Sequence, residues 1–173
     1  MKPKPKYKAA ASPTSTAKTT AIASPEDQLA DFIDKFDPDK QTLIRSAHKV
    51  LRKRLPTANE LVYDNYNFFV IGYCSTDRPT DCIVSLAAAA NGVGLSFYYG
   101  ASLHDPHKLQ LGSGSQNRFV RLESAKVLAD PRVGALIAAA VAQGKTPLPE
   151  SGKGKLIIRS ISAKQRPRRK LVR

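Results

Sequence analysis

Four β-rich runs in the middle of the chain constrain its fold more than any other feature. They carry mostly aliphatic and aromatic residues and lie at residues 61–63, 67–74, 82–88 and 93–99. An Asp-Arg-Pro triplet at 77–79 and an Asn-Gly pair at 91–92 supply turns between neighbouring runs. Such short connections join antiparallel strands, because parallel neighbours need a crossover of about a dozen residues. The sequence therefore predicts an antiparallel meander.

Helical patterns flank these strands. A Ser-Pro-Glu-Asp start at 24–27 is typical of a helix N-terminus, with Ser as the cap and Pro at the first helical position. Further helices are expected at 38–55 and 131–142, another strand at 119–122, and a candidate edge strand at 156–161. We therefore predict an α+β domain in which an antiparallel β-sheet of about five to six strands has helices packed on one face.

The net positive charge of the chain comes from its two ends. Residues 1–24 contain five lysines and no acidic residue, and residues 143–173 contain ten basic residues and one acidic residue. Since the net charge is +14, residues 25–142 are formally neutral. We predict a disordered basic tail at 1–24, one core domain at 25–142, a Gly- and Pro-rich linker with the candidate edge strand at 143–165, and a basic tail at 166–173.

The lysines and arginines of these tails favour contact with nucleic acid. They would neutralise phosphates without reading bases, so binding would be non-specific and would weaken steeply with salt. The candidate residues are Lys2, Lys4, Lys6, Lys8, Arg166, Arg168, Arg169 and Lys170. Tails that only keep the protein soluble are the alternative interpretation.

The loop before residues 119–122 is the most site-like segment. Its small residues expose backbone N–H groups, and the two arginines that follow could pair with an anion. The candidate anion-binding residues are Gly112, Ser113, Gly114, Ser115, Arg118 and Arg121. The loop lacks the Gly-Lys-Ser/Thr of a phosphate-binding loop. It also precedes a strand, whereas nucleotide-binding fingerprints precede a helix. A tight surface loop with two exposed arginines is the alternative.

An acidic stripe on the first expected helix could bind a hard cation weakly. It consists of Asp27, Asp31 and Asp34, and an ordinary solvated helix face is the alternative. The two cysteines, Cys74 and Cys82, flank a hairpin loop, and antiparallel pairing could place them opposite one another. We expect both to be reduced thiols.

No catalytic motif is recognisable. A hydrolase built on His104 with Ser113 or Ser115 is the enzymatic alternative, but no nucleophile is paired with a base at a readable spacing. We therefore predict a non-enzymatic binding domain without a cofactor, whose ligand is a metal ion, an anion or a protein partner.

The chain shows no apolar signal segment. Its longest apolar run, residues 135–142, is too short to cross a bilayer. A cytoplasmic location without membrane contact is the expectation from these two features.

Several segments also match a known family. The matching residues are Glu60, the Tyr-Asp-Asn-Tyr-Asn-Phe run at 63–68, Leu-Gly-Ser-Gly at 111–114, Arg-Phe-Val-Arg-Leu-Glu-Ser at 118–124 and Leu-Ile-Ile-Arg-Ser-Ile at 156–161. In these residues the chain resembles the bacterial YdhG-like domains of unknown function, whose fold is similar to that of frataxin. The resemblance implies a frataxin-like fold and weak iron binding on an acidic ridge, which would map to Asp27, Asp31 and Asp34, with Asp37 beside it.

Overall fold

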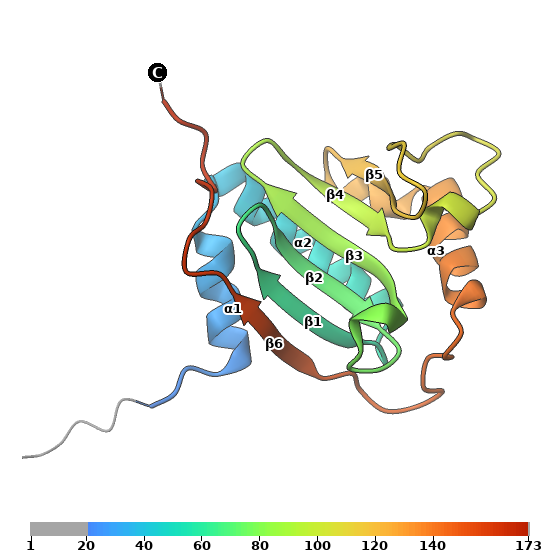
Figure 1. Cartoon of the computed structure of the whole chain (residues 1–173), viewed down its shortest axis with the longest axis horizontal. Coiled ribbons are helices and arrows are strands. Elements are labelled where there is room, and N and C mark those ends of the chain that lie inside the picture. Colours follow the sequence, from blue (N-terminus) through green and yellow to red (C-terminus); the bar gives the residue numbers. More distant parts are fainter. Residues whose placement is uncertain (1–20, 173) are drawn as a thin grey trace, which may run out of the picture.

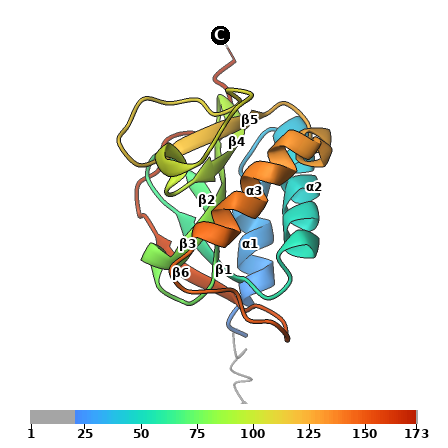
Figure 2. The same cartoon turned by 90° about the vertical axis from the view of Figure 1, so that its right-hand side faces the viewer.

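The computed structural model describes residues 21–172, and within this range the chain forms one mixed β-sheet with three α-helices on one of its faces (Figures 1 and 2). The predicted α+β fold is thereby confirmed. Lys2, Lys4, Lys6 and Lys8 lie outside the described residues.

Six strands build the sheet in the order β5-β4-β3-β2-β1-β6. Their bounds are β1 Asn59–Asp64, β2 Phe69–Cys74, β3 Cys82–Ala89, β4 Gly92–Phe97, β5 Arg118–Leu122 and β6 Leu156–Ile161. The first five strands form the predicted antiparallel meander. The candidate edge strand joins the sheet as β6, but it pairs with β1 in the parallel direction. The expectation of a wholly antiparallel sheet is therefore wrong at this edge.

Three helices pack on one face of the sheet: α1 Pro25–Asp34, α2 Pro38–Arg54 and α3 Pro131–Gln143. The predicted cap of α1 is present, since the Ser24 hydroxyl accepts a hydrogen bond from the Asp27 N–H at 3.1 Å. The Asp27 carboxylate in turn accepts a hydrogen bond from the Ser24 N–H, which completes a capping box. The helix start is thus fixed by local side chains before any tertiary contact forms.

The main core lies between the helices and the sheet. Alternate residues of β2 to β4 point into it, among them Phe69, Ile71, Val84 and Leu95. The side chains between them in sequence point to the opposite, helix-free face of the sheet, because successive strand residues alternate in direction. The helices therefore cover one face and leave the other open (Figure 2).

After β6 the C-terminal segment continues past α1 (Figure 1). Residues 166–172, expected as a basic tail, lie beside the ends of α1 and β1. Arg168 is only 4% exposed and pairs with the fully buried Asp64 at 2.9 Å. The Lys170 N–H donates to the Asp37 carboxylate at 3.2 Å. Arg168 and the backbone of residue 170 therefore hold this segment against the domain, whereas Leu171 and Val172 are exposed.

Candidate binding groove on the open face of the sheet

On the open face of the sheet, the outward residues of the three middle strands, β2 to β4, are uncharged, and most of them are small. The pairing register sets Tyr63 beside Val70, Val70 beside Ala87, Ala87 beside Gly94, and Gly94 beside Arg121. The next row contains Leu61, Gly72, Ser85, Ser96 and Phe119 in the same strand order. An open antiparallel face normally carries polar residues. Here the outward positions of β2, β3 and β4 carry no charged side chain.

These rows enclose a groove of about 440 Å³ on the open face. Small residues of β3 and β4 form its floor. Phe68 comes directly before β2 and Phe119 lies in β5, so the two aromatic residues flank these two strands. The Phe68 side chain is 51% exposed, which is high for a large apolar residue. The lining residues are Phe68, Val70, Ser85, Ala87, Asn91, Gly92, Val93, Gly94, Ser96, Asn117, Phe119 and Arg121. The groove is therefore lined mostly by apolar atoms, with two aromatic side chains and a few polar ones among its lining residues.

Two glycines of β4 lie beside the β5 side chains, at positions where a Cβ atom would make ordinary contacts. A Cβ atom at Gly92 would be 3.4 Å from an Nη of Arg121, and one at Gly94 would be 3.6 Å from the ring of Phe119. The Arg121 guanidinium is exposed and has no ion-pair partner among residues 21–172. The groove thus has one available cation at its wall.

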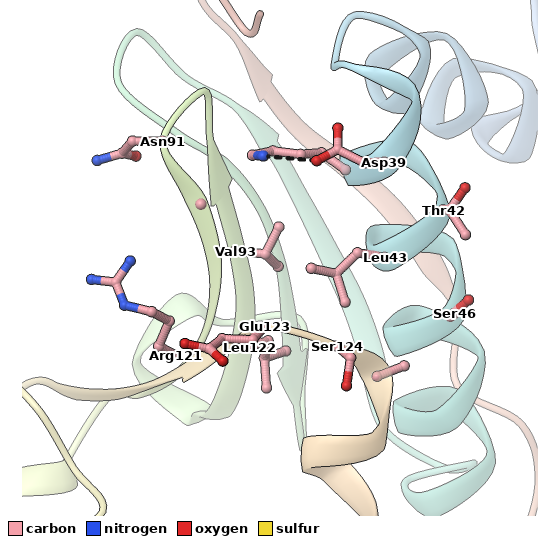
Figure 3. A pocket seen from close by; sticks show the side chains of 13 residues that line it. Asp39, Thr42, Leu43, Ser46, Asn91, Val93, Arg121, Leu122, Glu123 and Ser124 are labelled. Carbon is pink, nitrogen blue, oxygen red and sulfur yellow. Dashed lines mark hydrogen bonds and ion pairs between the residues drawn. The ribbon is translucent and has the colours of Figure 1, made fainter. Parts of the chain in front are cut away.

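A second hollow of about 420 Å³ borders the first at Arg121 and at the Asn91-Gly92 turn. Figure 3 shows Arg121 and Asn91 on the sheet side of this hollow, with Thr42 and Ser46 on α2 across from them. Its lining carries two carboxylates, from Asp39 and Glu123, and two cations, Lys40 and Arg121. The carboxylates offset the cations here, whereas Arg121 alone is charged among the residues that line the open-face groove, which is therefore the better anion site.

The predicted anion loop is only partly brought to this groove. Arg118 Nη1 donates hydrogen bonds to the carbonyl oxygens of Asn117, at 2.9 Å, and Gly114, so its side chain closes its own loop. Residues 112–115 are exposed and do not line the groove. Of the predicted set, only Arg121 reaches it. Asn117 joins Arg121 there and accepts a hydrogen bond from the Ser96 hydroxyl at 2.7 Å.

The predicted metal residues are engaged locally or exposed. Asp27 belongs to the capping box, and Asp34 pairs with Arg45 at 2.6 Å. Asp31 is exposed on α1. Within the described residues, no group of three or more His, Cys, Asp or Glu side chains is placed to hold a metal ion. Iron binding on this face stays a prediction.

The predicted C-terminal nucleic-acid residues have different surroundings. Arg168 is buried in its pair with Asp64, whereas Arg166 is exposed with its guanidinium 5.6 Å from the centre of the Tyr66 ring. Arg169 is exposed and donates to the Asp34 carbonyl at 3.2 Å. Lys170 is also exposed. Three of these four cations therefore remain accessible to a phosphate backbone.

A buried charge cluster lies on the helix side of the sheet. Glu60 accepts hydrogen bonds from Arg52 Nε at 2.7 Å and contacts His48 Nε2 at 2.7 Å. Burial alone would raise the pKa of Glu60, but these two partners outweigh it and lower the pKa to about 2. None of the three residues lines the groove. We read this cluster as structural, tying α2 to β1.

Sequence reasoning missed Phe68, Asn91, Asn117 and Phe119. The usable signal was the alternation within each strand, with small residues at 85, 87 and 89 in β3 and at 92, 94 and 96 in β4. Small residues on an exposed strand face leave space rather than fill it, which is typical of a surface approached by a ligand or another backbone.

Comparison with family models, curated proteins and solved structures found no match to this chain. No helix within residues 21–172 has the length and apolar character needed to cross a membrane.

Proposed function

We propose that this protein is a non-enzymatic binding domain that holds an organic anion in the open-face groove. The observation that carries the proposal is an accessible cation, Arg121, at the wall of an uncharged groove between two aromatic rings. Such a groove suits a ligand with a flat apolar part and one anionic group, because ligand sites are largely apolar with a few polar groups that fix orientation. The resemblance to YdhG-like domains is compatible with this role.

The residues that line the groove would make different contacts with such a ligand. The rings of Phe68 and Phe119 would contact the flat part of the ligand, and each such aromatic contact is worth about 0.5–1.5 kcal/mol beyond burial. Arg121 would donate hydrogen bonds to the anionic group, worth about 1.5–3 kcal/mol. Asn91 and Asn117, which also line the groove, would supply neutral hydrogen-bonding groups.

An NMR titration of the full-length protein with 1-naphthyl phosphate tests this proposal, with 1-naphthol and inorganic phosphate as separate arms. Shifts should gather on β4 and β5, and naphthyl phosphate should bind more tightly than either fragment. Arg121→Gln should weaken binding by roughly 10- to 100-fold, the equivalent of one charge-assisted hydrogen bond. Arg45→Gln is the matched control, since Arg45 is an exposed arginine of α2 outside the groove.

Equal binding by the wild type and Arg121→Gln would overturn the proposal. Shifts that gather instead at Thr42 and Ser46 would place the ligand in the second hollow and would also contradict it.

Non-specific binding of nucleic acid is the second candidate function. The observation that favours it is the absence of acidic residues from 151–172, a segment that forms the β6 edge and then packs along the domain. Exposed cations of this segment are Lys153, Lys155, Arg159, Lys164, Arg166, Arg169 and Lys170. Such a one-sided distribution of charge attracts phosphate backbones.

Fluorescence anisotropy with a labelled single strand and a labelled duplex, recorded across a salt series, tests this second function. A steep linear fall of log K with log salt is expected. Replacing Arg166, Arg169 and Lys170 together by Gln should reduce the slope. An unchanged slope would remove this segment from the function.

A further inference from the structure

The two cysteines form a pair on the open face of the sheet, next to Ser85, which lines the groove. Cys74 ends β2, Cys82 begins β3, and the register places them directly opposite one another. Residues in that relation have Cα atoms about 4.5–5.5 Å apart. Disulfides span Cα separations of about 4.4–6.8 Å. The backbone is therefore already placed for a bond between the two sulfur atoms.

The side chains also converge. A Cβ atom at Gly72 would lie 3.2 Å from Cys82 Sγ and 3.6 Å from Cys74 Sγ, so both sulfur atoms lie over the same glycine. They pack with Leu61 in a small cluster separate from the main core, with Tyr63 at its side. Glycine at position 72 leaves room for two sulfur atoms to approach one another.

The two thiols differ in acidity. A hydrogen bond with Cys74, supported by one with Ser85 at 3.2 Å, lowers the pKa of Cys82. The same shared interaction, together with burial, raises the pKa of Cys74. The thiolate is the reactive form of cysteine, so the lowered pKa favours Cys82 as the nucleophile of the pair.

The two thiols also differ in access. Cys82 is 9% exposed, Cys74 only 1%. Cys82 is also among the residues around a cavity of about 210 Å³ between the 75–81 loop, Tyr99 and the end of α3. A water molecule takes about 30 Å³ in the liquid, so this cavity admits a molecule of peroxide size. A small oxidant would therefore reach Cys82 first.

We propose that Cys82 and Cys74 are a peroxide-reactive dithiol that closes to a disulfide. The Cys82 sulfur attacks one oxygen of a small hydroperoxide, the O–O bond breaks, and the other oxygen leaves as an alcohol or water after taking a proton. Cys82 is then a sulfenic acid. The Cys74 sulfur attacks the Cys82 sulfur, its proton goes to the departing hydroxyl, and water leaves. In total two thiols are oxidised to a disulfide and one hydroperoxide is reduced.

The disulfide would fix the ends of β2 and β3 on either side of the hairpin loop at 75–81. That loop contributes Thr80 and Asp81 to the same 210 Å³ cavity. The oxidised form would therefore hold this wall of the cavity in place. A low-molecular-weight thiol would restore the dithiol by thiol–disulfide exchange.

Intact-mass analysis of the full-length protein tests the proposal, because the chain has no other cysteine. Reduced protein is treated with equimolar hydrogen peroxide, quenched over time with an alkylating reagent, and weighed. The expected product has lost two hydrogen atoms and takes up no alkyl group. A parallel series with tert-butyl hydroperoxide measures the size of oxidant that the cavity admits.

Two variants separate the roles. Cys74→Ser should stop at the sulfenic acid of Cys82, trapped by dimedone, at a rate close to that of the wild type. Cys82→Ser should react at least tenfold more slowly at Cys74. Arg121→Gln should oxidise as the wild type does, so failure of the anion site leaves this inference standing.

Three results would overturn the proposal. In the first, wild-type protein keeps two alkylatable thiols in excess peroxide, while the same chain unfolded in urea is oxidised. In the second, the two serine variants react at equal rates. In the third, the only disulfide formed joins two copies of the chain. The wild-type measurement decides the first and third cases even if a variant does not fold.

Discussion

Removing the Arg168 side chain should destabilise the whole domain, although only five residues of the sequence follow it. Its guanidinium donates to the fully buried Asp64 carboxylate at 2.9 Å and also to the Asn65 carbonyl. It lies 5.9 Å from the centre of the Phe36 ring. Arg168→Met keeps most of the apolar stem but leaves Asp64 with one cationic partner fewer.

The size of the effect follows from burial. Breaking a buried ion pair by removing one partner costs about 3–5 kcal/mol, because the other charge stays in the interior. Asp64 retains its ion pair with Lys35, whose side chain is 39% exposed. We therefore expect the lower end, about 3 kcal/mol. Arg169→Met is the matched control: Arg169 is the exposed neighbour, and its loss should change stability by no more than about 0.5 kcal/mol.

Urea unfolding of both variants and the wild type measures these differences, and its pH dependence gives a second check. Burial raises the pKa of Asp64, but hydrogen bonds from Lys35 and Arg168 outweigh it and leave the pKa below its usual value. The contribution of the pair is therefore present above the unfolded pKa of about 3.9 and is lost as the pH falls through the folded pKa. A loss at neutral pH within 1 kcal/mol of the control would refute the reasoning.

Two further predictions concern the β1 edge of the sheet. Gly154→Ala should destabilise by at least about 1–3 kcal/mol, because the new Cβ would lie 1.7 Å from the Ala58 carbonyl oxygen; Gly114→Ala, with open space around it, is the control in the same urea assay. Glu60→Gln should flatten the pH dependence of thermal unfolding: the wild type loses stability as the pH falls from the unfolded pKa towards about 2, since Arg52 and His48 stabilise the charged form. Equal slopes for Glu60→Gln and the wild type would contradict this assignment.

The sequence predicted the features that depend on neighbouring residues. The β3–β4 turn lies where the Asn-Gly pair predicted it, but it consists of Ala90 and Asn91, and Gly92 is the first residue of β4. Ser24 caps α1 as expected. The parallel pairing of β6 was missed. Its apolar run predicts that the segment is a partly buried strand, but it does not predict which strand lies beside it. Its place next to β1 is set by the long connection through α3.

The candidate groove could not be predicted from the sequence either, because it also depends on which strands lie side by side. Local composition drew attention to the Gly-Ser loop at 112–115, where Arg118 in fact bonds to loop carbonyls. The groove depends on register, since Ala87, Gly94 and Arg121 come together only when three strands are aligned. The segment at 166–172 was read as a tail from its charge, although Arg168 supplies a cation that the buried Asp64 requires.

Gly94 offers a direct test of whether the groove exists for binding or only as a by-product of the fold. A Cβ atom there would make ordinary contacts, 3.5 Å to the Val120 carbonyl and 3.6 Å to the Phe119 ring, so packing does not require glycine. Glycine inside a strand costs about 0.5–1 kcal/mol relative to alanine. Gly94→Ala should therefore raise the free energy of unfolding by about that amount, while its methyl group fills part of the groove floor and weakens binding of 1-naphthyl phosphate. A variant that gained stability and still bound the probe as the wild type does would show that the ligand lies elsewhere. We expect the substitution to raise stability and to weaken binding. If this face bound no ligand, a glycine that lowers stability would have no function to explain it.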